Sequence, residues 1–319
     1  MKTFFRCAAV FLALMMLSGC TKPNTNPTES TPPTGNPTVP SNPTDPSESA
    51  KTGWVTVDGK TYYYLRDGSC MTGKVEISGK TYYFDSAGVM QTGWITLDNL
   101  SYYFLPDGAM AVGQVEIDGR NRFFTADGQE VLVVNPWNAL PDGYDPDLIT
   151  MGEPYGKDGT QVSRVCYEAL KQMIDDCNKE CPRVYIISSF RSVEYQEGLF
   201  ENRIQRFQNE GYSREEAEKL AASVVARPGT SEHHTGLAVD IIDTRSWDLT
   251  EIQETLPGQQ WLMANSWRYG FILRYPKDTI ESTGIIYEPW HYRYVGVELA
   301  TAVFESGLTL EEYFESLSQ

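Results

Sequence analysis

A 20-residue period across residues 53–128 is the feature that most limits how this chain can fold. Each of four units opens on a glycine, ten residues before a pair of aromatic residues. The pairs are Tyr63-Tyr64, Tyr83-Phe84, Tyr103-Phe104 and Phe123-Phe124. A turn dipeptide such as Asp58-Gly59 stands between glycine and pair, so each unit predicts a β-hairpin. Because one hairpin cannot bury its own face, we expect an all-β solenoid of stacked hairpins over residues 53–130.

These units resemble the cell-wall-binding repeats of choline-binding proteins, glucan-binding proteins and clostridial toxins. In choline binders, aromatic side chains from neighbouring repeats surround a quaternary ammonium group and attract it through cation–π contacts. The resemblance implies a ligand site formed by Trp54, Trp94, Tyr63 and Tyr83. The ligand stays open between the choline of teichoic acid and a cell-wall glycan. Aromatic residues that only pack the solenoid are the alternative.

The repeats depart from the choline-binding pattern at several positions. Lys74 and Gln114 replace the opening tryptophan in two of the units. Arg122 stands where the other units carry a tyrosine before the aromatic pair, which indicates that the fourth unit caps the array.

The first 20 residues have the layout of a secretory signal, with a basic start, an apolar run over residues 7–17 and small residues before Cys20. Leu17-Ser18-Gly19-Cys20 resembles a bacterial lipobox, which implies removal of residues 1–19 and lipidation of Cys20. A plain signal peptide is the alternative. Residues 20–52 are rich in Pro, Thr, Ser and Asn and predict a disordered tether. We therefore expect lipid anchoring at the extracellular face of a bacterial membrane, in contact with the wall.

The net charge and the pattern of apolar residues limit the function and the fold of the rest of the chain. The formal net charge of −17 repels polyphosphate and argues against nucleic-acid binding. From residue 131 the period stops, and helical spacing predicts helices at 161–180, 193–209, 213–225 and 260–269, and from 299 onward. Strand patterns occupy 183–190, 236–242 and 271–275. These elements do not alternate regularly, so we expect an α+β domain with a small, mainly antiparallel sheet over residues 131–319.

All three histidines of the chain fall in two short segments of this second domain. Two imidazoles, one carboxylate and an open position make a catalytic zinc site, and His233, Asp240 and His291 fit that set. Glu288 would then remain unligated, as a general base for a water at the metal. The spacing of these residues alone is only weak support for a zinc site, because each histidine could equally be an ordinary core or surface residue.

Further residues around the histidines strengthen the case. The segments Ser231-x-His233-x-x-Gly236-x-Ala238-x-Asp240, Glu288-Pro289-Trp290-His291-x-Arg293-Tyr294 and Ser188-Ser189-Phe190-Arg191-Ser192 resemble the VanY-like D-alanyl-D-alanine carboxypeptidases. The resemblance spans residues 131–319 and implies the zinc-peptidase fold that the hedgehog signalling domain shares. It implies Zn²⁺ ligands at His233, Asp240 and His291, and a catalytic base at Glu288.

The same resemblance places the substrate-side arginine at Arg191. Ser231 and Gln196 are candidates for contacts to substrate or to the ligands, with ordinary capping and surface hydrogen bonding as the alternative. The motif register selects His233 over His234 as the ligand, and Asp240 over Asp243. We expect His234 either at the rim of the site or behind the residues that line it, and Asp243 as a solvated acid at a strand end.

The implied activity is zinc-dependent removal of the terminal D-alanine from peptidoglycan stem peptides. D,D-carboxypeptidases, which cleave pentapeptides, and L,D-carboxypeptidases, which cleave tetrapeptides, share the same motifs. The sequence does not distinguish between these two activities. A wall-binding protein with an inactive peptidase domain is the alternative from another class. Besides the lipid site Cys20, four cysteines remain after removal of the signal, and we expect them to be buried free thiols rather than a disulfide scaffold: Cys70, Cys166, Cys177 and Cys181.

Overall fold

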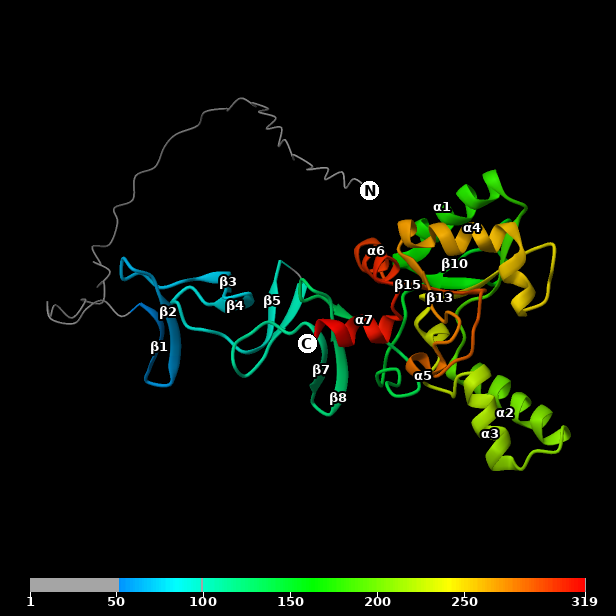
Figure 1. Ribbon diagram of the computed structural model, residues 1–319, viewed down its shortest axis with the longest axis horizontal. Coiled ribbons are helices and arrows are strands. Elements are labelled where there is room, and N and C mark those ends of the chain that lie inside the picture. Colours follow the sequence, from blue (N-terminus) through cyan, green and yellow to red (C-terminus); the bar gives the residue numbers. More distant parts are fainter. Residues whose placement is uncertain (1–51, 99, 319) are drawn as a thin grey trace, which may run out of the picture. The chain divides into compact units, whose positions relative to one another are not determined.

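The computed structural model describes residues 52–98 and 100–318 (Figure 1). The expected secretory signal, Cys20 and nearly all of the predicted tether lie outside the described residues. Within them, no helix combines the length and apolar composition that crossing a membrane requires.

The predicted hairpins are confirmed in all four repeats. Each consists of two five-residue antiparallel strands: β1 (Gly53–Val57) with β2 (Lys60–Tyr64), β3 (Gly73–Ile77) with β4 (Lys80–Phe84), β5 (Gly93–Leu97) with β6 (Leu100–Phe104), and β7 (Gly113–Ile117) with β8 (Arg120–Phe124). In the first turn Asp58 and Gly59 have φ angles of 52° and 74°. Two consecutive positive φ angles are what a type I′ turn requires, and Asp-Gly tolerates them.

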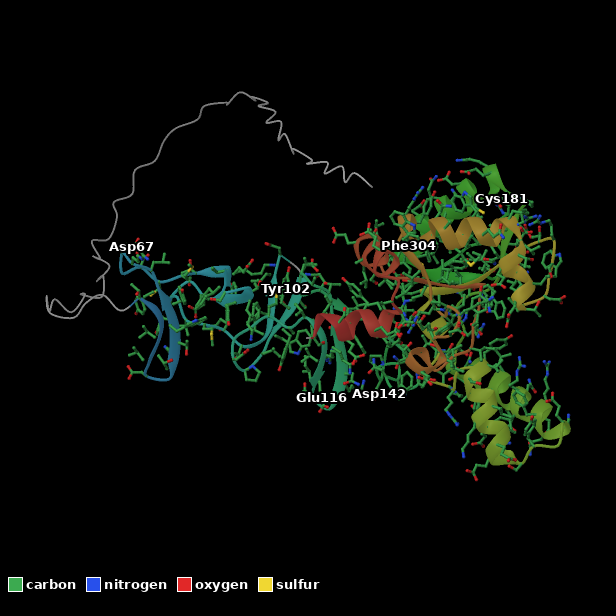
Figure 2. The ribbon with its side chains drawn as sticks, in the orientation of Figure 1. Asp67, Tyr102, Glu116, Asp142, Cys181 and Phe304 are labelled. Carbon is green, nitrogen blue, oxygen red and sulfur yellow. The ribbon has the colours of Figure 1, made fainter. Side chains whose placement is uncertain are left out.

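The repeats share a core, as the period predicts. The second aromatic residue of the last three pairs is fully buried, at Phe84, Phe104 and Phe124. Successive repeats are also joined through the backbone, because Met90 N donates to Thr61 O and Met110 N donates to Thr81 O, each at 2.7 Å. Tyr102, labelled in Figure 2, is only 6% exposed and packs in the same stack.

The fourth repeat is followed directly by the second domain. A short strand β9 (Glu130–Val131) adds to β8. Phe123 packs against Phe314 of helix α7 (Leu310–Leu317), with ring centroids 5.4 Å apart. Gln114 N donates to Ser318 Oγ at 2.9 Å. The last repeat therefore ends the array by packing on the C-terminal helix.

An antiparallel four-stranded sheet forms the centre of the second domain, which confirms the α+β expectation. Its strand order is β12 (Val184–Ser188), β13 (Ala238–Asp243), β15 (His291–Tyr294) and β14 (Phe271–Leu273). Helix α1 (Arg164–Glu180) and helix α4 (Pro257–Asn265) pack on it (Figure 1). The core between α1 and the sheet includes Leu170, Ile174, Val239 and Ile241.

Helix α1 starts three residues later than the apolar spacing predicts. Residues Gln161–Ser163 form strand β11, which pairs antiparallel with β10 (Leu148–Thr150). The apolar Val162 is fully buried in this pairing. A single buried residue at helical spacing fits a strand equally well, so the pattern extended the helix too far.

Two further helices form a hairpin beside the sheet. Helix α2 (Val193–Asn209) has the predicted bounds and is capped by Ser192, whose hydroxyl accepts a hydrogen bond from Tyr195 N. Helix α3 (Arg214–Val224) begins with a capping box formed by Ser213 and Glu216. Phe200, Ile204, Ala217 and Ala221 fill the space between the two helices.

Short elements complete the domain. They are the 3-10 helices η1 (Glu232–Thr235), η2 (Glu251–Thr255) and η3 (Ser266–Tyr269), with helices α5 (Ile280–Thr283) and α6 (Val297–Ser306). The predicted helix over residues 260–269 is therefore an α-helix followed by a 3-10 turn.

All four cysteines in the described part of the chain are free thiols. Cys166 and Cys177 are buried, as expected, whereas Cys70 and Cys181 are partly exposed. Cys181, labelled in Figure 2, directs its Sγ to Pro257 O at 3.6 Å.

Candidate metal centre

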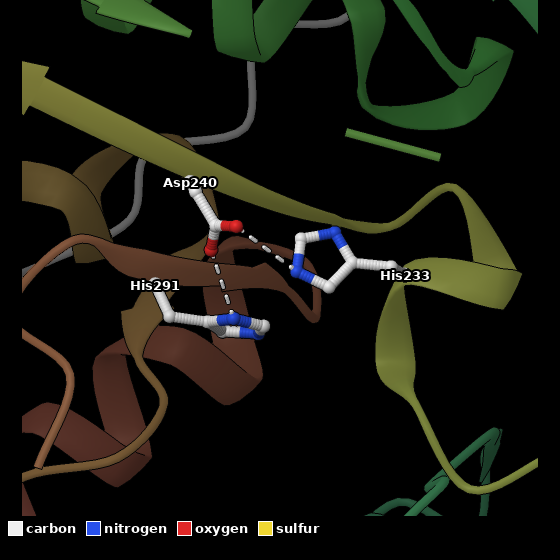
Figure 3. A group of neighbouring side chains, drawn as sticks. All are labelled: His233, Asp240 and His291. Carbon is white, nitrogen blue, oxygen red and sulfur yellow. Dashed lines mark ion pairs between the residues drawn. The ribbon is translucent and has the colours of Figure 1, made fainter. Parts of the chain in front are cut away.

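Three elements bring the predicted ligands together (Figure 3). His233 lies in η1, Asp240 lies in the middle of β13, and His291 is the first residue of β15. Asp240 and His291 are direct partners in the antiparallel register, so their side chains lie on the same face of the sheet. Each of the three residues is 2% exposed. The predicted ligand set therefore converges in the interior.

The two distances from Asp240 to the imidazoles match the spacing of ligands around one metal ion, and all three ligand atoms lie within 4.8 Å of one another. His233 Nε2 lies 3.4 Å from Asp240 Oδ2, and His291 Nδ1 lies 3.2 Å from Asp240 Oδ1. Tetrahedral Zn²⁺ with bonds of about 2.0–2.1 Å separates its ligand atoms by roughly 3.3 Å. Asp240 Oδ1 is buried without a hydrogen bond among the described residues. The donor set fits a zinc ion, since an ion would satisfy that oxygen.

The backbone fixes the orientation of His233. Its Nδ1 lies 2.7 Å from the carbonyl oxygen of Ser189, and a carbonyl can only accept, so Nδ1 carries the proton. Nε2 is then left with a lone pair directed at Asp240. Burial lowers the pKa of His233 to about 4, which keeps the imidazole neutral and able to ligate.

A buried carboxylate faces the other side of His291. Glu232 Oε2 lies 3.6 Å from His291 Nε2. Burial alone would lower the pKa of His291, but Asp240 and Glu232 outweigh it and raise the pKa to about 9. Binding a metal at Nδ1 would release that proton. Carboxylates behind ligating histidines commonly set ring orientation and basicity.

Sequence reasoning did not identify Glu232 as part of the site. Glu232 Oε1 accepts from Arg274 Nε and from Arg293 Nη1, each at 2.9 Å. Although burial would raise the pKa of Glu232, these two guanidiniums hold it well below its usual value. Arg274 also pairs with Glu311 of α7. The only local signal was an acidic residue directly before a histidine, and nothing in the sequence shows that two distant arginines meet it.

Glu288 stands at the edge of the same group. Its Oε2 lies 3.5 Å from His291 Nδ1, and its side chain is 12% exposed. Burial raises the pKa of Glu288 to about 7. A carboxylate with such a pKa holds and releases a proton near neutral pH, which is what a general base and acid must do.

The predicted substrate-side arginine contacts the central carboxylate. Arg191 Nη2 lies 2.7 Å from Asp240 Oδ2, and Ser188 Oγ accepts from Arg191 Nε and Nη2. Gln196 is fully buried, where its Oε1 accepts from Arg191 Nη1 at 3.4 Å and its Nε2 donates to Ala226 O. Gln196 therefore supports Arg191 and does not line the cavity, whereas Ser231 does line it.

The two neighbouring candidates that the motif register rejected lie elsewhere. His234 is buried and not part of the group, because its Nδ1 faces Arg191 O at 2.7 Å and its Nε2 accepts from Gly229 N. The expectation of a solvated Asp243 is wrong. Asp243 is fully buried, pairs with Arg245 at 2.7 Å and accepts from Gly258 N at 2.9 Å. The arginine and the turn before α4 compensate its charge.

The metal group opens into a cavity of about 1120 Å³. Arg191, Ser231, His233, Asp240, Glu288 and His291 line its inner part. One face of helix α2 lines another part, together with the segments 224–226, 249–251 and 285–287. A substrate can therefore reach the open side of the three ligands and Glu288 together.

Comparison with known proteins agrees with this geometry. A family model described as D-alanyl-D-alanine carboxypeptidase (VanY) matches residues 159–297, and a choline-binding repeat model matches 51–91 and 91–137. A D-alanyl-D-alanine carboxypeptidase of Enterococcus faecalis is 36% identical over 189 residues, which cover 58% of this chain and 66% of that protein. The chain thus spans just under two thirds of that relative.

Solved structures of both a D,D-peptidase and an LD-carboxypeptidase resemble this chain. A variant of the D,D-pentapeptidase VanY from a VanB-type resistance cassette, in complex with Zn(II), is 37% identical with a TM-score of 0.51, covering 57% of this chain and 97% of that one. The LD-carboxypeptidase LdcB is 34% identical with a TM-score of 0.51, covering 63% of this chain and 92% of that one. The chain therefore belongs to the VanY family of D-alanyl-D-alanine carboxypeptidases and carries choline-binding repeats ahead of the region that matches it.

Proposed function

We propose that this protein is a zinc-dependent carboxypeptidase that removes the terminal D-alanine from peptidoglycan stem peptides. Residues 131–319 form the peptidase domain in this proposal. The observation that carries it is the convergence of His233, Asp240 and His291 with Glu288 in one cavity. The Zn(II) held by the VanY relative supports the choice of metal.

Each residue of the site has a distinct task in this proposal. Zn²⁺ held by His233, Asp240 and His291 would polarise the scissile carbonyl and lower the pKa of a water. Glu288 takes the proton from the attacking water and passes it to the leaving amine, which its pKa of about 7 permits. Ser189 and Glu232 hold the two imidazoles in place from behind.

Arg191 is assigned to the C-terminal carboxylate of the substrate. A guanidinium grips a carboxylate with two parallel hydrogen bonds, and Arg191 lines the cavity beside the metal group. Once Asp240 ligates the metal, its charge is satisfied there, and Arg191 is available to a second carboxylate. Gln196 keeps the guanidinium at the cavity wall in both situations. Ser231, 3% exposed at the same wall, is assigned a contact to substrate.

The D,D-carboxypeptidase reading is preferred over the L,D reading. The matching family model and the Enterococcus relative both carry the D-alanyl-D-alanine description. Pentapeptide and tetrapeptide stems incubated separately with the purified protein, with products weighed by mass spectrometry, test this choice. The proposal expects loss of one alanine from the pentapeptide only. Cleavage of the tetrapeptide alone would replace D,D with L,D, and cleavage of neither would leave the wall-binding alternative.

The repeats are proposed to hold the enzyme at the cell wall. The Trp54 side chain is 44% exposed, and its ring centroid lies 5.1 Å from that of Tyr63 and 4.8 Å from that of Tyr82. Exposed tryptophan flanked by tyrosine suits either a choline group or a sugar face. Trp94 is 41% exposed, but the Arg122 guanidinium lies 5.2 Å from its ring centroid. Trp54 is therefore the better candidate for the ligand site, and Tyr83 is half-buried between repeats.

Lipidation at Cys20 would add the membrane anchor.

A further inference from the structure

The cavity extends far beyond the metal group along helix α2. The residues of α2 that line it include Tyr195, Leu199, Arg203, Arg206 and Asn209. Their spacing of three or four places them on one face of the helix. The fourteen steps from Tyr195 to Asn209, at about 1.5 Å each, span roughly 21 Å, the length of about six residues of extended peptide.

A carboxypeptidase places only one residue on the leaving side of the scissile bond. The remaining cavity must therefore hold the part of the peptide that precedes this bond. The face of helix α2 that lines the cavity then contacts the residues of the substrate that precede the scissile bond. This step rests on the proposed function.

Two arginines on this face of α2 have no carboxylate partner. Arg203 is half-buried and Arg206 is exposed, and neither makes an ion pair or side-chain hydrogen bond with any described residue. Arg214 on the neighbouring helix, by contrast, pairs with Glu201 and Glu218. In a chain with 43 acidic and 26 basic residues, these two guanidiniums lie one helical turn apart at a cavity without an acidic partner.

The acidic groups around the two arginines act on them only at a distance. Burial and the Arg206 guanidinium both lower the pKa of Arg203, whereas Glu210 and Glu288 act on it in the opposite direction without forming an ion pair. The same cavity is also lined by Glu251. Because acidic and basic side chains both line the cavity, binding of a polyanion is disfavoured. Binding of a single anionic group at the two arginines is favoured.

We propose that Arg203 and Arg206 form a subsite for a carboxylate on the substrate peptide upstream of the scissile bond. A guanidinium binds a carboxylate through charge-assisted hydrogen bonds, and partial burial of Arg203 strengthens the contact. The subsite selects peptides with a free acid at that position over their amidated counterparts.

Matched peptides test the subsite. Six pentapeptides ending in D-Ala-D-Ala carry either Glu or Gln at the first, second or third residue and are otherwise identical. The purified full chain with zinc should cleave the Glu peptide about tenfold more efficiently at one of these positions, mainly through a lower KM. Added salt should reduce this preference, because the subsite is partly exposed.

Substitutions on the cavity-lining face of helix α2 identify which residues cause the preference for Glu over Gln. Arg203→Gln and Arg206→Gln should each reduce the Glu-to-Gln ratio, and the double variant should bring it close to one. Arg203→Lys should keep part of it. Arg66→Gln, in an exposed turn of the first repeat, removes the same charge outside the cavity and should leave the ratio unchanged.

The outcomes separate this inference from the proposed function. Equal cleavage of Glu and Gln peptides at all three positions, or a preference that survives the double variant, overturns the subsite and leaves the carboxypeptidase intact. Failure of the zinc-loaded chain to cleave any of these pentapeptides overturns the D,D-carboxypeptidase and the subsite with it.

Discussion

Glu232 and His291 face each other in the interior, with Glu232 Oε2 3.6 Å from His291 Nε2. Neither atom has a hydrogen bond among the described residues. The opposite nitrogen of the same ring, Nδ1, faces Asp240 and Glu288. A proton held at Nε2 by Glu232 leaves Nδ1 free for a metal, so the carboxylate decides which nitrogen ligates.

Replacing Glu232 with Gln should weaken both zinc binding and folding. Loss of the charge behind His291 should lower zinc affinity about 10–100-fold, measured by competition with a chromophoric chelator. Arg274 and Arg293 would lose a buried partner, so the free energy of unfolding should fall by about 3–5 kcal/mol in denaturant titrations. Glu298→Gln, at an exposed site on α6, serves as the control. Wild-type zinc affinity in Glu232→Gln would show that the carboxylate does not orient the ring.

Glu288→Gln should separate metal binding from turnover. The amide cannot take a proton from water, so kcat should fall by about 10²–10⁴ or more. Zinc content, measured by elemental analysis, should remain near one ion per chain, because Glu288 is not among the three ligands. Activity close to that of the wild-type protein would remove Glu288 from the mechanism.

The buried cysteines should resist alkylation in the folded protein. Burial raises the pKa of Cys166 to about 12 and also raises the pKa of Cys177. At pH 8 a thiol with a pKa near 12 is ionised in only about one molecule in ten thousand. Iodoacetamide should therefore label Cys70 or Cys181 first, and Cys166 and Cys177 only in denaturant, as read by peptide mass spectrometry. Rapid native labelling of Cys177 would contradict the packing of α1.

Trp54→Ala should reduce binding to cell walls more than Trp94→Ala does. Trp54 offers an exposed ring beside Tyr63 and Tyr82, whereas Arg122 already lies over Trp94. Sedimentation with purified walls, with and without free choline, measures the effect and separates choline from glycan. Equal losses in the two variants would show that the ligand does not distinguish the two tryptophans.

The sequence predicted those parts of the fold that local chemistry determines. The 20-residue period and the turn dipeptides predicted the hairpins, and the helical pattern of residues 193–209 predicted both ends of α2. The predictions were wrong where contacts with residues distant in the sequence determine the local structure. Pairing with β10 converts the start of the predicted first helix into a strand. Arg245 and Gly258 allow Asp243 to be buried.

The site shows the same division. The resemblance of two short motifs to the VanY-like enzymes predicted the group His233, Asp240 and His291, which ligand spacing alone indicated only weakly. Glu232 escaped prediction because Arg274 and Arg293, which compensate its charge, lie 42 and 61 residues away. The contact of Arg191 with Asp240 likewise depends on the turn between β12 and α2, which the sequence does not specify.

The central claim is that one zinc ion is held between His233, Asp240 and His291. A crystal structure of the zinc-loaded protein, with anomalous scattering recorded above and below the zinc edge, tests it most directly. The account predicts one strong peak about 2.0–2.2 Å from His233 Nε2, His291 Nδ1 and an Asp240 oxygen, with Glu288 close but unligated. A zinc peak held by other residues, or no peak at this group in zinc-saturated protein, would contradict it.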